Sequence, residues 1–273
     1  MVNYIKNKEK IPCSVGILTF NSEKTLGRAL ESLKGFAEII LADGGSTDGT
    51  LKIAQEYGCK VIQQSNPGHP IEDFAKERNR TLDASSYDWF FYIDSDEFIS
   101  DGLREEIGEI VHQENPKHLL YRVKYRKVSP DLKKEYRTFK EYYQIRFFNK
   151  KMEARFVKPM HEKVSFNEDK YSIGIIESPW YVVLDTLSNF LAYKRKVDYR
   201  IGVMIDRANI NSLPILLKAG VFVPIKEIIK SFLKIIYLPL RHGKNAIPVR
   251  YELYRIYGEF IRIQKTFTKY FRK

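Results

Sequence analysis

Val15-Gly16-Ile17-Leu18-Thr19-Phe20-Asn21 is the stretch that decides the fold. Its first four residues are a short apolar run, which predicts a buried strand, and Asn21 or Ser22 can cap the helix that follows. The apolar residues of this helix recur at helical spacing: Leu26, Ala29, Leu30 and Leu33. A buried strand followed at once by an amphipathic helix is typical of a parallel α/β sheet.

The same alternation repeats along the chain. Ile39–Ala42 predicts a second strand, which ends in Asp43-Gly44-Gly45-Ser46-Thr47-Asp48-Gly49, and Lys60-Val61-Ile62 begins a third after a short helical pattern. We therefore predict an α/β protein with a Rossmann-like sheet flanked by helices. Ligands on such sheets bind beyond the carboxyl ends of the strands, where Thr19–Asn21 and Asp43–Asp48 lie.

The loop after the first strand excludes two common classes of nucleotide site. Leu18–Glu23 stands where a dinucleotide enzyme carries its G-x-G-x-x-G fingerprint, so NAD binding is disfavoured. The phosphate-binding P-loop pattern is absent as well. The Gly44–Gly49 turn by itself could be an ordinary capped loop.

The strongest chemical signal is a carboxylate cluster at a strand end. The aromatic strand Trp89–Ile93 is followed by Asp94-Ser95-Asp96-Glu97. Strand alternation places Asp94 and Asp96 on one side of the chain, where their hard oxygens can share Mg²⁺ or Mn²⁺. Such an ion could neutralise charge on a bound diphosphate. An isolated D-x-D is usually a solvated turn, but here it closes an aromatic strand and follows two other strand-end loops.

Together these segments resemble the family 2 glycosyltransferases of GT-A fold. Ser14–Asn21 is similar to that family's first strand with its T-[YF]-N ending, and Leu41–Thr50 to its D-x-G-S-T-D-G-T loop. Phe74–Asn79, Asp88-Trp89 and Asp94–Glu97 resemble a subgroup that contains lipopolysaccharide-core glucosyltransferases. The resemblance covers residues 13–100. It departs from the commoner D-D-G-S form at Gly44, which takes the place of the second acid.

The resemblance implies roles for individual residues. It assigns nucleotide-sugar binding, with a UDP-sugar favoured, to Thr19, Phe20, Asn21, Asp43, Arg78 and Asp94. Phe20 would stack on the base, and Asp94 and Asp96 would hold the metal. The residues alone leave alternatives open, because Phe20 could be core and Arg78 and Asn79 could form a solvated helix face.

The acceptor half is less patterned. His161-Glu162 resembles a V-H-E element of the same subgroup. We hypothesise that His161 completes the metal or diphosphate site and that Glu162, with Asp96 as a second catalytic residue, acts as the general base. Family 2 enzymes usually invert the anomeric centre, which needs such a base. Asp131 and Glu97 remain rival bases.

Positive charge is distributed unevenly along the chain. Residues 1–193 carry 28 Lys and Arg against 29 Asp and Glu, whereas residues 194–273 carry 18 against 5. We predict a GT-A catalytic domain over residues 1–193, with a nucleotide-sugar half at 1–110 and an acceptor half at 111–193. Residues 194–273 are predicted to form a basic, amphipathic helical extension broken at Pro239 and Arg241-His242-Gly243, with one apolar face: Ile225, Ile228, Ile229, Phe232, Leu233 and Ile236.

Three interpretations of this extension remain. A helical pair packed on the catalytic domain would leave a solvated basic face. An anionic membrane surface fits the charge and the aromatic residues better, and the segment also resembles the C-terminal part of membrane-associated family 2 enzymes with lipid-linked acceptors. Nucleic acid is not expected as a partner, because no recognition motif is present.

The expected protein is a metal-dependent, inverting glycosyltransferase that acts on a lipid-linked or cell-surface glycan. Cys13 and Cys59 are too few for a disulfide framework, and neither a signal peptide nor a membrane-spanning run is apparent. We expect a cytoplasmic protein, peripheral at the cytosolic face of the membrane. Two alternatives are a nucleotidyltransferase, whose usual Gly-rich basic loop is missing at Thr19–Glu23, and a non-catalytic, membrane-bound sugar-nucleotide-binding protein.

Overall fold

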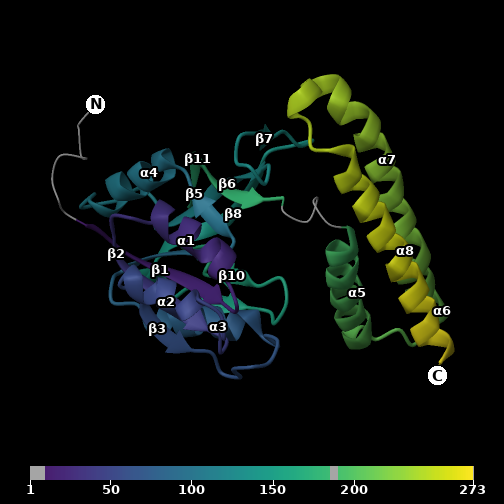
Figure 1. Ribbon diagram of the computed structural model, residues 1–273, viewed down its shortest axis with the longest axis horizontal. Coiled ribbons are helices and arrows are strands. Elements are labelled where there is room, and N and C mark those ends of the chain that lie inside the picture. Colours follow the sequence, from purple (N-terminus) through teal and green to yellow (C-terminus); the bar gives the residue numbers. More distant parts are fainter. Residues whose placement is uncertain (1–9, 185–189, 273) are drawn as a thin grey trace. The chain divides into compact units, whose positions relative to one another are not determined.

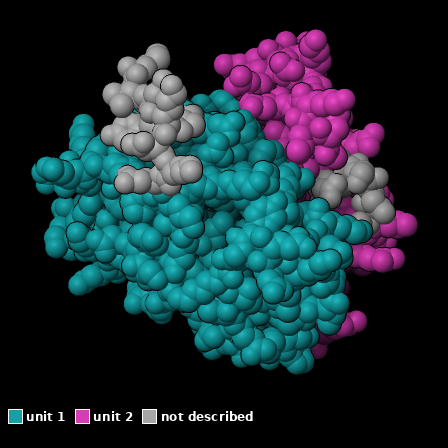
Figure 2. All heavy atoms as spheres, turned by 60° about the vertical axis from the view of Figure 1, so that its left-hand side comes forward, with its two compact units in different colours: residues 1–126, 141–182 teal, residues 127–140, 183–273 magenta. Residues whose placement is uncertain are grey.

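The computed structural model describes residues 10–184 and 190–272. Contacts divide the chain into two compact units, which Figure 2 colours separately: unit 1 is residues 1–126 and 141–182, and unit 2 is residues 127–140 and 183–273. Residues 127–140, 183–184 and 190–193, which fall in the predicted acceptor half, thus group with the C-terminal helices. Residues 185–189 of that half lie outside the described residues. The division into a donor half and an acceptor half stays a prediction.

Unit 1 is built on a mixed sheet in the strand order β3-β2-β1-β4-β8-β6-β11-β5 (Figure 1). These strands are β1 (Ile11–Thr19), β2 (Phe36–Asp43), β3 (Lys60–Gln63), β4 (Trp89–Asp94), β5 (Glu97–Ile99), β6 (Leu120–Val128), β8 (Tyr142–Asn149) and β11 (Ile173–Val183). The first four pair in parallel, and β8 joins β4 in antiparallel orientation. The predicted α/β sheet is therefore confirmed.

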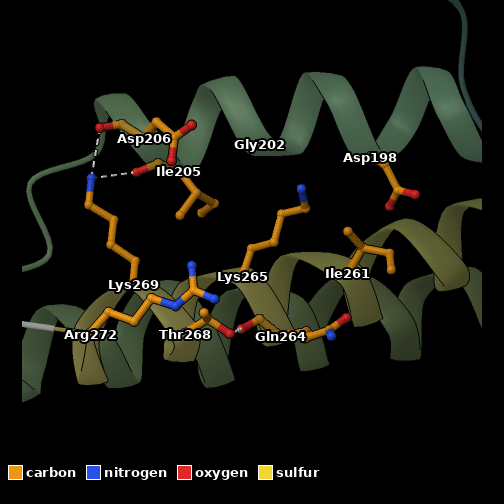
Figure 3. A pocket seen from close by; sticks show the side chains of 10 residues that line it. All are labelled: Asp198, Gly202, Ile205, Asp206, Ile261, Gln264, Lys265, Thr268, Lys269 and Arg272. Atoms are coloured by element: carbon orange, nitrogen blue, oxygen red, sulfur yellow. Dashed lines mark hydrogen bonds between the residues drawn. The ribbon is translucent and has the colours of Figure 1, made fainter.

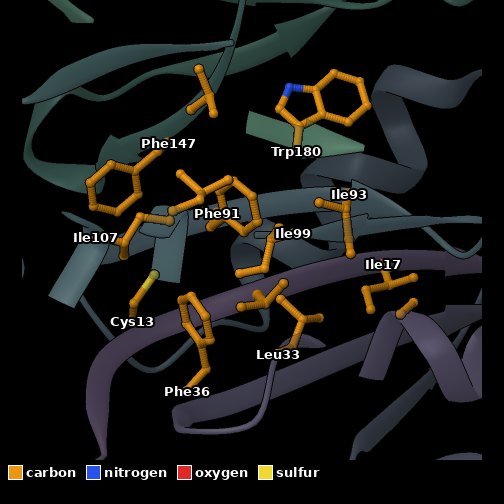
Figure 4. Packing of buried hydrophobic residues seen from close by; sticks show 14 of the residues in the cluster. Cys13, Ile17, Leu33, Phe36, Phe91, Ile93, Ile99, Ile107, Phe147 and Trp180 are labelled. Carbon is orange, nitrogen blue, oxygen red and sulfur yellow. The ribbon is translucent and has the colours of Figure 1, made fainter. Parts of the chain in front are cut away.

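The sheet is covered on both faces, as the alternation of β4 shows. Trp89, Phe91 and Ile93 point into one buried cluster with α1 (Glu23–Ser32), α2 (Thr50–Glu56) and α4 (Asp101–Val111), part of which Figure 4 draws. Phe90 and Tyr92 point into a second cluster with α3 (Phe74–Asp83). A strand that is apolar on both faces lies in the centre of such a sheet. The carboxyl end of β4 is thus held rigidly between two packed layers.

A small hairpin extends the layer of α3. Its strands are β9 (Arg155–Val157) and β10 (Lys163–Ser165), paired antiparallel. Asn79 of α3 donates to the Phe156 carbonyl at 2.9 Å and accepts from the Phe156 N–H at 3.0 Å. The loop of this hairpin, which contains His161 and Glu162, is therefore tied to the helix that contains Arg78.

Unit 2 is helical. It contains α5 (Phe190–Arg207), α6 (Leu213–Leu217), a π-helical turn (Lys218–Phe222), α7 (Val223–His242) and α8 (Val249–Phe271), with β7 (Glu135–Tyr136) paired to the last residues of β6. α8 packs against both α5 and α7. The predicted C-terminal helices are confirmed, and the break predicted at Pro239 and Arg241-His242-Gly243 falls at its glycine rather than at Pro239. α7 continues through Pro239 and ends at His242, and the next residue, Gly243, adopts a positive φ of 52°.

The helices of unit 2 are amphipathic rather than uniformly apolar. In the part of the chain that the structure describes, none of the helices combines the length and the hydropathy needed to cross a membrane.

Candidate functional site

The ends of β1 and β2 form the first wall of the site. Thr19 and Asp43 are register partners, and the Thr19 hydroxyl donates to Asp43 Oδ1 at 3.0 Å. The other carboxylate oxygen accepts from the backbone N–H groups of Gly45 at 2.9 Å and Ser46 at 2.8 Å. Asp43 is buried, so its carboxylate shapes the loop that follows β2. Its role in nucleotide-sugar binding stays a prediction.

Asn21 fastens the loop after β1 to the loop after β2. Its φ is 47°, a left-handed conformation that Asn tolerates better than most residues. Its side-chain oxygen accepts from the Thr47 N–H at 2.9 Å, and its own N–H donates to the Ser46 hydroxyl at 2.9 Å. Asn21 therefore positions the two loops relative to each other.

Phe20 lies on the surface of this wall. Its ring is 50% exposed, so the alternative that Phe20 belongs to the core is wrong. A Cβ on Gly44 would stand 3.2 Å from Phe20 Cδ2 and 3.1 Å from Gln64 Oε1. Gly44 therefore lets an exposed aromatic side chain lie close against the β2 loop, where its ring is a suitable platform for a planar ligand.

Arg78 connects three parts of the site. Its side chain is only 1% exposed, so the alternative of a solvated helix face is wrong. One guanidinium nitrogen donates to the Ile93 carbonyl at 2.9 Å, and another forms an ion pair with Asp94. Nε lies 3.5 Å from Oε1 of Glu162, and the guanidinium lies over the Tyr92 ring at 5.0 Å. Arg78 thus brings Asp94 and Glu162, 68 positions apart in the sequence, to one cation.

The turn of the D-x-D segment is held from several sides. The Ser95 hydroxyl lies 2.9 Å from the Ser22 hydroxyl, and Arg28 donates to the Asp96 carbonyl at 3.1 Å. The Asp94 N–H donates to Glu97 Oε2 at 2.9 Å. The side chain of Asp96 is exposed, whereas Asp94 is intermediate. Both carboxylates therefore lie at a fixed, accessible strand end.

Glu97 lies beneath this turn in a buried ion pair. Its carboxylate is 3.1 Å from the guanidinium of Arg146, which also lies over the Trp180 ring at 4.0 Å. Burial raises the pKa of Glu97 to about 8, Arg146 opposes this rise, and Asp94 adds to it. Glu97 is buried and pairs with Arg146 and the Asp94 N–H, so it supports the turn from within the protein.

The hairpin loop contributes Glu162 and its neighbour His161. Lys158 and His161 have positive φ values of 76° and 55°, and the Pro159 carbonyl accepts from the N–H of Phe74, the first residue of α3, at 2.9 Å. The Glu162 side chain is partly accessible, and His161 is exposed. Residues 10–184 and 190–272 contain no group of three or more His, Cys, Asp or Glu side chains that could hold a metal ion together. The ligand role of His161 stays a prediction.

Three residues that support the site were not predicted from the sequence. The buried Gln64 donates to the backbone carbonyls of Thr19 at 3.2 Å and Ala42 at 2.8 Å. Arg146 and Ser22 support the D-x-D turn in the ways described above. Arg146 had a visible signal, because a charged residue inside the apolar run Ile145–Phe148 needs a buried partner.

The sequence and its relatives identify the family. Residues 14–172 match the model of glycosyl transferase family 2. The lipopolysaccharide core biosynthesis glycosyltransferase LpsC of Rhizobium meliloti is 36% identical over 102 residues, which cover 37% of this chain and 38% of LpsC. A glycosyltransferase of Rickettsia typhi is 33% identical over 170 residues, covering 60% of this chain and 56% of that protein.

A third relative is TarS of Staphylococcus aureus, a poly(ribitol-phosphate) beta-N-acetylglucosaminyltransferase. It is 30% identical over 122 residues, which cover 41% of this chain and 21% of TarS. The crystal structure of TarS 1–349 compares with a TM-score of 0.47 at 16% identity, covering 93% of this chain and 80% of that one. The sequence matches thus cover between 21% and 56% of these relatives' own length. The family model matches more than half of the chain, and the chain belongs to glycosyl transferase family 2.

Proposed function

We propose that this protein transfers a sugar from a nucleotide-diphosphate-sugar, with a UDP-sugar favoured, to a hydroxyl of a lipid-linked or cell-surface glycan. The observation that carries the proposal is the pairing of Arg78 with both Asp94 and Glu162 beside the Phe20 platform. Membership of family 2 supports glycosyl transfer, and similarity to LpsC supports a cell-envelope glycan as acceptor. The nucleotidyltransferase alternative gains no support from these comparisons.

Asp94 and Asp96 are the residues that we propose to hold Mn²⁺ or Mg²⁺. Two accessible carboxylates fit such an ion, because Mg²⁺ commonly takes one or two protein carboxylates and fills its remaining positions with water and substrate phosphates. When bound, the ion would offset charge on the leaving diphosphate. His161, from the loop that is anchored to α3, is proposed to approach the same diphosphate.

Glu162 is proposed as the general base. The acceptor oxygen bonds to the anomeric carbon while the bond from that carbon to the diphosphate oxygen breaks, and Glu162 takes the hydroxyl proton. Its carboxylate is oriented by Arg78 and is partly accessible. Of the two rival candidates for the general base, Glu97 is buried and paired with Arg146. Asp131 accepts from the Ser129 hydroxyl and the Lys133 N–H, which lower its pKa and make it a weaker base.

We further propose that the protein works as a peripheral enzyme at the cytosolic face of an anionic membrane, where a lipid-linked acceptor would be presented. The excess positive charge of residues 194–273 supports this location. The free thiols of Cys13 and Cys59 are compatible with a reducing compartment.

The test is a screen of UDP-, GDP-, CMP- and dTDP-sugars for nucleotide release in the presence of Mn²⁺, which needs no acceptor. We expect slow release from a UDP-sugar and loss of that release with EDTA. Nucleotide binding in a thermal-shift assay without release from any donor would instead favour the non-catalytic alternative. A protein that neither binds nor cleaves any donor contradicts the proposal.

A further inference from the structure

α7 displays a continuous apolar face to solvent. Seven large apolar residues, one at the end of the preceding π-helical turn and six on α7 itself, are between 47% and 83% exposed: Phe222, Ile225, Ile229, Phe232, Leu233, Ile236 and Leu240. They recur at intervals of three and four, so they lie on one side of the helix. We call these seven residues the α7 apolar face. Single exposed apolar residues are ordinary on proteins, but an aligned row of seven marks an interaction surface.

Packing inside unit 2 uses the opposite side of this helix. The buried residues of α7 are Pro224, Ser231 and Leu238, spaced by seven, and α7 packs against α8. By helical period these three residues lie roughly opposite Ile229 and Ile236. The α7 apolar face is therefore not needed for the packing of the helical unit.

A basic row borders the face. Lys226, Lys230 and Lys234 follow one another at intervals of four along one flank of α7. Between residues 213 and 244 the sequence contains one acidic residue, Glu227, and it already pairs with Lys230 at 2.6 Å and Arg255 at 3.9 Å. The face thus combines an apolar surface with a row of three lysines that carries more positive charge than the single carboxylate of Glu227 offsets.

Unit 2 also contains a cavity, but its lining does not offer a free binding surface like the α7 apolar face. A space of about 510 Å³ lies between α5 and α8 (Figure 3). Lys269 enters it, but its ammonium group donates to the carbonyl oxygens of Ile205 at 2.8 Å, Asp206 at 2.7 Å and Ala208 at 2.8 Å. This lysine caps the carboxyl end of α5 and is not available to a ligand.

We propose that the α7 apolar face is the membrane-docking surface of the protein, with α7 lying in the plane of an anionic bilayer interface. Its apolar side chains enter the boundary between headgroups and acyl chains, and its lysines meet anionic headgroups. This rests on the membrane association proposed above and assigns it to one face of one helix. α7 is apolar on this face and charged beside it, a separation that is typical of helices that lie in a membrane interface and not of helices that span the membrane.

A second copy of the chain fits the face less well. In an antiparallel pair the lysine row would oppose the same row of the partner, and in a parallel pair it would oppose the flank with Ile228 and Ile235. Neither arrangement gives the lysines an acidic partner. An anionic lipid surface satisfies both the apolar face and the charge.

The experiment measures partition of the full chain onto vesicles of phosphatidylglycerol and phosphatidylcholine. The variant Ile229→Ser/Phe232→Ser removes two side chains that are each 53% exposed. The matched control Leu253→Ser/Phe260→Ser removes the same pair of residue classes from α8, at 48% and 58% exposure. We expect the α7 pair to lower partition about tenfold or more and the α8 pair to change it by less than about twofold.

A second set of variants tests whether the lysines of α7 contact anionic lipid headgroups. Lys226→Gln/Lys230→Gln should lower binding about fivefold per charge on these vesicles, and wild-type binding should fall with added salt and be weak on pure phosphatidylcholine. Lys194→Gln/Lys196→Gln on α5 removes the same charge and should have a small effect.

Three results would overturn the assignment: equal losses for the α7 and α8 pairs, unchanged vesicle binding with conversion of a dimer to a monomer by the α7 pair, or binding to RNA and not to vesicles. Nucleotide release by the same variants in solution separates the two proposals. Retained release with lost vesicle binding supports docking through α7, whereas absent release in the wild type contradicts only the enzymatic proposal.

Discussion

At the scale of single residues, the site is organised around a buried cation with two carboxylate partners. Arg78 is enclosed by the Tyr92 ring and the Ile93 carbonyl, so it cannot move away from Asp94 and Glu162 without breaking contacts in the interior. A buried charge is stable only while its partners remain in place. The geometry of the two carboxylates is therefore part of the stability of the fold.

Replacing Arg78 tests this coupling. Arg78→Lys keeps the charge but loses the planar fork that reaches three partners, so we expect the free energy of unfolding to fall by about 1–3 kcal/mol. Nucleotide affinity should fall as well. Denaturant unfolding and calorimetric titration with UDP measure the two effects. Lys76→Gln, on the exposed side of the same helix, is the control and should change neither; an Arg78→Lys protein with normal stability contradicts the role of Arg78 as a buried anchor.

The variant Glu162→Gln tests whether Glu162 is needed for sugar transfer but not for UDP binding. The amide cannot take a proton, so we expect transfer to fall about 100-fold or more while the affinity for UDP stays near that of the wild type. Steady-state transfer rates and UDP titration are the measurements. Glu168→Gln, an exposed change in the same unit, should be silent. Near-normal turnover by Glu162→Gln would remove this residue from the role of base.

Gly44→Ala tests the aromatic platform. The new Cβ would crowd Gln64 and the Phe20 ring at 3.1 Å and 3.2 Å, so the ring must shift away from its resting position. We expect the dissociation constant for UDP to rise several-fold with little loss of stability. Gly27→Ala in α1, where an added Cβ meets nothing within 4 Å, should leave binding unchanged and raise stability by about 0.5–1 kcal/mol. Equal UDP affinity in both variants contradicts a role for Phe20 in binding.

At the scale of elements, α3 links the two sides of the site. Its side chains Glu77, Arg78 and Asn79 contact the loop after β3, the end of β4 and strand β9 in turn. Its first residue, Phe74, binds the hairpin loop through the Pro159 carbonyl. The start of α3 therefore affects the position of Glu162 as well as the stability of the helix.

The cap of α3 gives a prediction at this scale. The Asp73 carboxylate accepts from the Lys76 N–H at 2.9 Å. Asp73→Ala should lower the free energy of unfolding by about 1 kcal/mol, because the first turn loses its side-chain partner. Asp73→Asn keeps an acceptor and should cost a few tenths of that amount. Thermal unfolding checks the order of the two variants, and an alanine variant as stable as the asparagine variant contradicts the cap.

Local pattern was sufficient to predict the parallel part of the fold and the strand-end loops. Apolar runs and helical spacing predict β1, α1 and β2, and the carboxylates that follow the aromatic run are found at the end of β4. The expected alternation of Asp94 and Asp96 along an extended chain is wrong, because β4 ends at Asp94 and the next two residues form a turn. The pattern could not reveal that Arg78 is buried. Glu77-Arg78-Asn79 has the composition of a surface, and its partners lie elsewhere in the chain, on β4 and in the hairpin loop. Burial of a polar residue depends on such distant partners.

At the scale of the whole molecule, the proposed catalytic site and the proposed membrane-binding surface belong to different units. The strand-end site lies within unit 1, and the excess positive charge lies in residues 194–273, which belong to unit 2. Summed charge indicates the kind of surface that a protein approaches, whereas catalysis depends on single side chains. The antiparallel pairing of β4, β8 and β6 and the grouping of residues 127–140 with the helices were beyond prediction, because both depend on pairings between segments distant in sequence.

The most direct test of the central claim, that the carboxylates at the end of β4 carry out metal-dependent sugar transfer, is the rate of nucleotide release from a UDP-sugar in Mn²⁺. Asp96 suits this test because its side chain is exposed, so Asp96→Asn should leave the fold intact. We predict release by the wild type and by the surface control Asp169→Asn, and a loss of about 100-fold or more in Asp96→Asn. Release by Asp96→Asn at the wild-type rate would contradict the account.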